Sequence, residues 1–206
     1  MKRFLLVIAL LMSLFMSLFM SLSVMAQQTD SLLFDAYLRE DMRAWKEHIS
    51  RQNSDFRIQN LLIEYGLCGY MVDREKKSAL PYVQQFKSHI INHKSQLPAG
   101  YYEMYMSAVY VYELRLHESV HPVRAMNLAK QATRLAPNDP LVLSYYGTCL
   151  FYAPAPFGSK KEALTWFEKA EKFFRAPQYR FCWVREANQM YIEQCKEKLR
   201  DGNSNR

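Results

Sequence analysis

The sequence has few of the residues that interrupt helices. Its 206 residues include only six glycines and eight prolines, whereas Ala, Leu, Met, Glu, Lys and Gln are plentiful. This composition favours long helices over many short strands and predicts an all-α fold. Half of the residues are hydrophobic, which is enough for one domain of ordinary size to bury a substantial core, and argues against disorder for most of the chain.

Several signatures of catalysis and of nucleic-acid binding are missing. The formal net charge is +7, but no block of five or more basic residues occurs, so nucleic acid is not an indicated partner. There is no G-x-S-x-G element, and Gly158–Lys161 lacks the spacing of a phosphate-binding loop, so Ser159 is better explained as a helix N-cap. His89 and His93 lie one helical turn apart without an evident third metal ligand, which favours an exposed helix face.

The N-terminus has the features of an export signal. Lys2 and Arg3 precede an apolar run from Phe4 to Met25, and Val24 and Ala26 are the small residues of a cleavage site. We therefore predict a signal peptide over residues 1–26 and a mature protein in the periplasm or cell envelope, with no membrane association after cleavage. The apolar run is also long enough, at about 20 residues, to remain as an uncleaved anchor. No cysteine follows it, so the usual lipoprotein signal is absent.

Apolar residues recur at three- and four-residue spacing through the rest of the chain, with breaks at Pro, Gly, Asn, Asp and Ser. This pattern predicts a helical domain over residues 27–200 and a disordered tail over 201–206. The predicted helices are Ser31–Ser50, Asp55–Asp73, Ser78–Gln96, Ala99–His117, Pro122–Ala136, Pro140–Tyr152, Ser159–Phe174 and Tyr179–Arg200.

A repeat of about 40 residues runs through these helices. Small residues occupy equivalent mid-helix positions, which are separated by 42, 39 and 40 residues: Gly66, Ala108, Gly147 and Ala187. Each has a larger residue four positions earlier, and these are Leu62, Met104, Leu143 and Trp183. Glycine inside a helix costs about 1 kcal/mol relative to alanine. We therefore expect a neighbouring helix to pack closely at Gly66 and Gly147.

The third unit carries a resemblance to the tetratricopeptide repeat (TPR) family. Leu143-x2-Tyr146-Gly147-x2-Leu150 is similar to the first helix of that repeat, and Ala163-x3-Phe167-x2-Ala170 is similar to the second. The resemblance implies a short right-handed solenoid of about three antiparallel helix pairs with additional N- and C-terminal helices. The period departs from the family value of about 34 residues, so a HEAT-like or irregular pairing stays open.

In the TPR family the first helix of each pair lines a concave groove, and here that surface would be largely aromatic. Tyrosine offers a broad contact area with a polar tip, which suits recognition of a protein or peptide partner. The resemblance therefore gives these candidate partner-binding residues: Tyr70, Met71, Tyr102, Tyr105, Tyr112, Phe151 and Tyr152. The alternative is that these side chains are core and that the C-terminal helix fills the groove.

One segment matches a catalytic motif. His117-Glu118-Ser119-Val120-His121 fits the H-E-x-x-H pattern of zinc hydrolases, in which both histidines lie on one face of a continuous helix. Pro122 follows directly and would interrupt that helix, where proline costs about 3 kcal/mol. We therefore predict no catalytic or metal site, no cofactor and no enzyme activity.

The four cysteines are predicted to be free thiols. Cys182 and Cys195 lie thirteen residues apart on one predicted helix, a separation of about 20 Å. Cys68 and Cys149 occupy equivalent positions two repeats apart, beyond the Cα separation of about 7 Å that a disulfide spans.

These features predict an exported, non-catalytic binding or scaffold module. A zinc-dependent hydrolase that uses the motif at 117–121 and an accessory subunit of an envelope transport complex are the alternatives. The identity of the partner and the oligomeric state do not follow from the sequence.

Overall fold

The computed structural model describes residues 31–51, 60–117, 122–154 and 156–204. Within these ranges the chain is helical and contains no β-strand. Residues 31–38 form a short helical segment. The elements that follow are α2 (Met42–Arg51), α3 (Asn60–Arg74), α4 (Lys76–Asn92), η1 (Lys94–Gln96), α5 (Tyr101–Leu116), α6 (Pro122–Leu135), α7 (Pro140–Tyr152), α8 (Lys160–Phe174), η2 (Pro177–Tyr179) and α9 (Trp183–Ser204).

Local sequence signals explain the ends of the central helices, and α5 to α8 start and finish within two residues of their predicted bounds. The carboxylate of Asp139 accepts hydrogen bonds from the backbone N–H groups of Leu141 (2.9 Å) and Val142 (3.2 Å), while Pro140 is the first residue of α7. An aspartate N-cap followed by proline is the favoured start of a helix. At the C-terminal end of α5, His117 ends the helix with a left-handed backbone conformation, at a φ of 66°.

Three predicted helices differ from the structure. The helix predicted over Ser78–Gln96 runs from Lys76 to Asn92 and is followed by the 3-10 turn η1. The prediction of one continuous helix over Ser31–Ser50 is wrong, because Glu40 has a φ of 55° and α2 starts anew at Met42. The Asp41 carboxylate accepts a hydrogen bond from the backbone of Arg43 (3.2 Å) and so caps the new helix. At the C-terminus, α9 continues to Ser204 instead of ending at Arg200, so the predicted disordered tail over 201–206 begins as helix.

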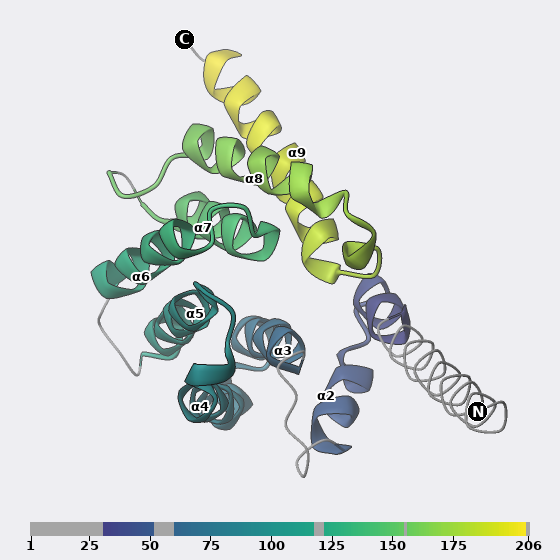
Figure 1. The fold of residues 1–206 in the computed structure, drawn as a ribbon. Coiled ribbons are helices and arrows are strands. Elements are labelled where there is room, and N and C mark those ends of the chain that lie inside the picture. The colour runs from purple at the N-terminus through teal and green to yellow at the C-terminus, as the bar shows by residue number, and fades with distance from the viewer. Residues whose placement is uncertain (1–30, 52–59, 118–121, 155, 205–206) are drawn as a thin grey trace, which may run out of the picture.

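Consecutive helices from α2 to α9 pack against one another. In addition α3 contacts α5, α5 contacts α7, and α7 contacts α9. We call these four helices the inner row; α4, α6 and α8 lie outside it (Figure 1). The helices follow an arc in Figure 1, and the start of α9 lies beside the helical segment 31–38.

The mid-helix glycines allow close packing, as the repeat predicted. A Cβ at Gly147 on α7 would lie 2.8 Å from the ring of Phe167 on α8. A Cβ at Gly66 on α3 would overlap the indole of Trp45 and lie 2.8 Å from that of Trp183. Real Cβ atoms do not approach neighbours so closely, so glycine is needed at both positions to keep these rings in place.

Three sequence predictions fall partly or wholly outside the described residues. These are the leader over residues 1–26, the start of the predicted helix at Asp55, and the motif residues Glu118 and His121. In the ranges that the structure does describe, no helix has the length and apolarity that a bilayer crossing requires.

Candidate binding face

The seven predicted partner-binding residues do not share one accessible surface. Four of them are buried, namely Met71, Tyr105, Tyr112 and Phe151. Tyr70 and Tyr102 are partly exposed, and Tyr102 stacks under the ammonium of Lys94 at 4.2 Å. Only Tyr152 is largely exposed, with 67% of its surface accessible.

The two buried tyrosines of α5 connect this helix to α3 and α4. Tyr112 donates a hydrogen bond from its hydroxyl to the backbone carbonyl of Tyr65 on α3 (2.9 Å). Gly69 makes room for this contact, because a Cβ there would lie 3.3 Å from the Tyr112 hydroxyl. Tyr105 packs edge-on against Phe86 of α4 at 5.5 Å between ring centroids. Burial raises the pKa of both phenols well above the ordinary value, so they remain neutral.

An aromatic cluster around Tyr65 and Trp183 occupies the middle of the inner row. The Tyr65 ring lies 5.7 Å from Trp183 of α9, 5.9 Å from Tyr145 of α7 and 6.2 Å from Tyr105 of α5. The candidate residues inferred from the resemblance did not include Tyr65, Tyr145 or Trp183. The sequence does mark two of these residues, since Tyr65 precedes the packing glycine Gly66 and Trp183 is the first residue of the fourth repeat unit. Neither position, however, indicates which neighbouring helix the side chain contacts.

The N-terminal segment closes this cluster. Tyr37 lies 5.3 Å from Trp183, and Phe34 lies 6.2 Å from Phe181, just before α9. Trp45 of α2 lies 5.6 Å from Trp183 and donates its indole N–H to the carbonyl of Leu33 (2.8 Å). The N-terminal segment therefore packs against the start of α9, at the end of the inner row. This arrangement corresponds to the alternative in which the aromatic residues are core, with the N-terminal segment contributing as well as the C-terminal helix.

A polar chain crosses the cluster between α6 and α7. The Tyr145 hydroxyl donates to Ser107 Oγ (2.9 Å), and Ser107 donates to the carbonyl of Ala125 (2.6 Å). The Cys149 thiol lies next to this chain, where burial raises its pKa to about 11 against the smaller effect of hydrogen bonds from Tyr145 and Ser107. All four cysteines are free thiols, as the helix register predicted.

An aromatic pair remains accessible where α7 and α9 meet. The hydroxyls of Tyr152 and Tyr191 lie 3.2 Å apart, and their rings are perpendicular with centroids 6.0 Å apart. The ring of Tyr191 stacks on that of Phe167 at 5.2 Å between centroids and also packs against that of Phe151 at 5.2 Å. We call Phe151, Tyr152 and Tyr191 the α7–α9 edge. At this edge the exposed ring of Tyr152 lies against packed aromatic rings.

Four of the five histidines lie in the described part of the chain. His117 is the residue just beyond the end of α5 and has a φ of 66°, whereas Glu118 and His121 of the motif lie outside the described residues. His89 is not on a fully exposed face as predicted, since its Nδ1 lies 2.7 Å from Oε1 of the buried Glu64. Within the described ranges no three His, Cys, Asp or Glu residues are grouped as metal ligands would be.

The Glu64 carboxyl is unusual because it is buried on α3. Its second oxygen, Oε2, has no hydrogen-bond partner among the described residues. Burial raises the pKa of Glu64, and the neighbouring His89 opposes that shift. Glu64 and His89 connect α3 to α4, and we interpret this contact as structural.

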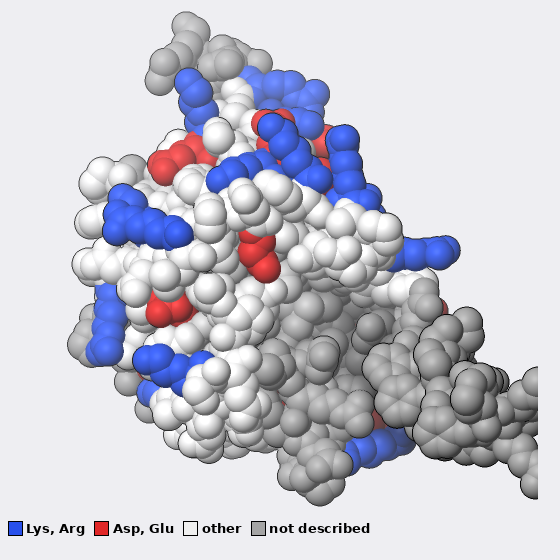
Figure 2. All heavy atoms as spheres, in the orientation of Figure 1, with Lys and Arg blue, Asp and Glu red and all other residues white. Residues whose placement is uncertain are grey.

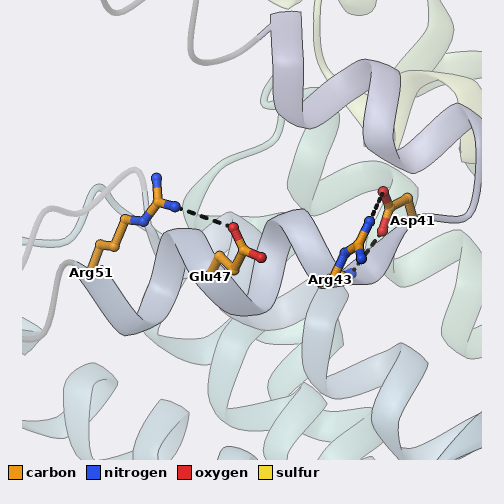
Figure 3. A network of polar contacts seen from close by, with 4 residues as sticks. All are labelled: Asp41, Arg43, Glu47 and Arg51. Atoms are coloured by element: carbon orange, nitrogen blue, oxygen red, sulfur yellow. Dashed lines mark hydrogen bonds and ion pairs between the residues drawn. The ribbon is translucent and has the colours of Figure 1, made fainter.

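Ion pairs on α2 are surface features. Arg51 contacts Glu47 at 3.2 Å one turn away, and Arg43 lies 3.8 Å from the Asp41 carboxylate, with all of these side chains largely solvent-exposed (Figure 3). Exposed pairs of this kind contribute about 0–1 kcal/mol. They stabilise the helix slightly and form no pocket.

The loop before α8 has the capping role that its sequence predicts. Ser159 Oγ accepts a hydrogen bond from the backbone of Glu162 (3.4 Å). Lys160 turns toward α7, donates to the carbonyl of Phe151 and places its ammonium 3.8 Å from the centre of the Phe151 ring.

Comparison of the chain with protein-family models, with curated proteins and with solved structures finds no match to any of them.

Proposed function

We propose that the chain is an exported, non-catalytic binding or scaffold module that holds a protein or peptide partner at the α7–α9 edge. Its helices would form a short TPR-like solenoid in which α3–α4, α5–α6 and α7–α8 are the pairs. The packing of consecutive helices, together with the contacts along the inner row, supports this arrangement. In it α9 is a first helix without a second, and its exposed residues, such as Gln189, Glu193 and Lys196, suit a terminal cap.

The observation that carries the proposal is the exposure of Tyr152. Tyr152 has 67% of its surface accessible, while its ring packs against those of Phe151 at 5.1 Å and Tyr191 at 6.0 Å between centroids. Exposed aromatic side chains that are pre-positioned in this way lose little entropy on binding and commonly anchor interfaces. Of the other six predicted groove residues, four are buried and Tyr70 and Tyr102 are partly exposed, so this edge carries the candidate ring that is most accessible.

Site-specific photo-crosslinking in the producing cells tests the proposal. A photoreactive phenylalanine at Tyr152 is compared with the same probe at Val123, which is similarly exposed, at 59%, but lies on α6 outside the inner row. We expect a discrete adduct from position 152, assigned by mass spectrometry to one partner peptide, and none from position 123. Equal or absent adducts at the two positions would contradict a specific site at this edge.

Export is a separate part of the proposal with its own test. Lys2 and Arg3 before the apolar run, and Ala26 at its end, support removal of the leader after Ala26. Intact-mass measurement of the protein from an envelope fraction should give a chain that starts at Gln27. A species that keeps residues 1–26 and sediments with membranes would replace cleavage with anchoring.

A further inference from the structure

The N-terminal segment, residues 31–38, is a short helix that lies beside the start of α9 (Figure 1). Two of its aromatic residues, one helical turn apart, contact aromatic side chains there. The Phe34 ring lies 6.2 Å from that of Phe181, and the Tyr37 ring lies 5.3 Å from that of Trp183. Helices that bind other proteins commonly present large apolar residues at positions i and i+3 to an apolar surface. The segment therefore occupies its surface in the way that a bound helix does.

Few polar contacts attach the N-terminal segment to the rest of the fold. In the described part of the chain a single hydrogen bond joins it to the helices that follow, from the indole N–H of Trp45 to the carbonyl of Leu33 (2.8 Å). Lys and Arg side chains gather over α8 and α9 in Figure 2. Even so, the exposed carboxylate of Asp35 forms no ion pair with a described residue. Because so short a helix is not stable alone in water, its apolar contacts hold it in place.

The connection between this segment and α2 has an unfavourable backbone conformation. Glu40 has a φ of 55° and is one of two non-glycine residues with a positive φ among the described residues. This left-handed region is uncommon for glutamate and costs free energy. Release of the segment would let Glu40 adopt an ordinary conformation, which offsets part of the packing that is lost.

The segment does not satisfy every polar group of the surface that it covers. The indole N–H of Trp183 is buried and has no hydrogen-bond acceptor among the described residues, which is unfavourable. The segment also exposes large apolar side chains, since 61% of Leu32 and 55% of Leu38 are accessible. A partner helix that placed an acceptor oxygen beside Trp183 would therefore fit this surface better than the segment does.

We propose that the surface formed by Trp45, Phe181 and Trp183 binds an amphipathic helix of a partner protein with aromatic residues at positions i and i+3, and that the N-terminal segment blocks this surface until the partner displaces it. The surface lies about 12 Å along α9 from Tyr191. It is separate from the α7–α9 edge, so the inference goes beyond the binding function proposed there. A tethered segment competes at an effective concentration of about 1 mM, so only a helix that binds better than the segment is admitted.

Fluorescence anisotropy with a labelled peptide tests this inference on the full chain as its cells produce it. The peptide has the sequence of residues 30–40 and represents the partner helix, because it carries both aromatic residues at the required spacing. The unmodified chain should bind it weakly, since its own segment competes. The double change Phe34→Ala and Tyr37→Ala in the chain should strengthen binding at least about tenfold, because it loosens the competitor and leaves the surface intact.

Matched changes assign the effect to the two aromatic residues. The double change Leu32→Ala and Leu38→Ala also removes two large side chains from the segment, but from exposed positions, and should alter peptide binding by less than about twofold. A peptide with alanine in place of Phe34 and Tyr37 should not bind the chain that has the loosened segment. Melting curves confirm that each variant is folded.

Three results would overturn the inference. The first is equal binding of the peptide to the unmodified chain and to the chain with Phe34→Ala and Tyr37→Ala, or binding to neither at about 1 mM peptide. The second is loss of peptide binding in Tyr152→Ser, which would place the peptide at the α7–α9 edge; unchanged binding in this variant supports a separate surface, whether or not the edge binds its own partner. The third is a dimer of the unmodified chain that the Phe34→Ala and Tyr37→Ala changes abolish, since the occupant would then be the segment of a second copy.

Discussion

The ring of Tyr37 lies 5.3 Å from the indole of Trp183, although the two residues stand near opposite ends of the described chain. Trp183 also contacts Trp45 and Tyr65, so one side chain joins the N-terminal segment, α2, α3 and α9. Its indole N–H is buried without an acceptor among the described residues. The contact that joins the ends is therefore made by ring packing alone.

Removal of this indole should both destabilise the fold and release the N-terminal segment. We expect Trp183→Ala to lower the free energy of unfolding by about 2–4 kcal/mol, less than for a fully buried tryptophan because Trp183 is partly exposed. Hydrogen exchange of residues 31–38 should become faster in the variant. Trp166→Ala is the control, since Trp166 packs on Tyr146 of α7 at 4.9 Å and should leave exchange at 31–38 unchanged. If the two variants changed hydrogen exchange at residues 31–38 equally, the result would contradict the idea that Trp183 holds this segment in place.

Gly147 offers a prediction in which two effects have opposite signs. Helix propensity alone favours Gly147→Ala by about 1 kcal/mol. The 2.8 Å approach of the Phe167 ring opposes it, and overpacking typically costs about 1–3 kcal/mol. We expect a net loss of stability in denaturant unfolding. Phe167→Leu should reduce that loss in the double variant, so a stabilising Gly147→Ala, or additivity in the double variant, would contradict the packing explanation.

The ends of helices were predictable from sequence where the cause lies within a few residues. Asp139 and Pro140 define the start of α7, and Pro122 defines the start of α6, because capping and the missing N–H of proline act locally. The break at Glu40 was missed, since neither proline nor glycine marks it and its backbone conformation is uncommon for glutamate.

The binding face was harder to predict because it depends on contacts between distant segments. The repeat placed Tyr105 and Tyr112 on the correct helix, yet they are buried by α3 and α4, and Tyr65 and Trp183 were not identified. Helical periodicity gives the face of a residue relative to its own helix. It does not indicate which other helix that face meets, and among the seven predicted residues only Tyr152 is largely exposed.

The buried Glu64 should make stability depend on pH. Because burial raises its folded-state pKa, the folded protein holds a proton that the unfolded chain has lost in the range above the ordinary carboxyl pKa, about 4.3. The free energy of unfolding therefore decreases as pH rises through this range. Glu64→Gln keeps a polar partner for His89 but cannot ionise. We expect its stability relative to the unmodified protein to increase from acid to neutral pH, measured by urea unfolding. Glu113→Gln, which removes an ion pair with Lys87 on the neighbouring helices, is the control and should not show this rise.

Thiol reactivity gives a prediction for the folded and the unfolded chain together. Cys68, Cys182 and Cys195 are buried, and Cys149 is partly exposed with a pKa of about 11. At pH 7 only about one Cys149 in ten thousand is then the reactive thiolate. We expect little alkylation of the native protein by iodoacetamide at pH 7, and a rate at Cys149 that increases with pH until it approaches 11.

Denaturation without a reducing agent should expose all four thiols, so mass spectrometry should find four labels per chain. Two labels or none would reveal a disulfide and contradict the arrangement in which Cys182 lies just before α9, Cys195 lies within α9, and Cys68 and Cys149 lie on α3 and α7. Fast alkylation of the native protein at pH 7, mapped to Cys149, would instead contradict the raised pKa of this thiol.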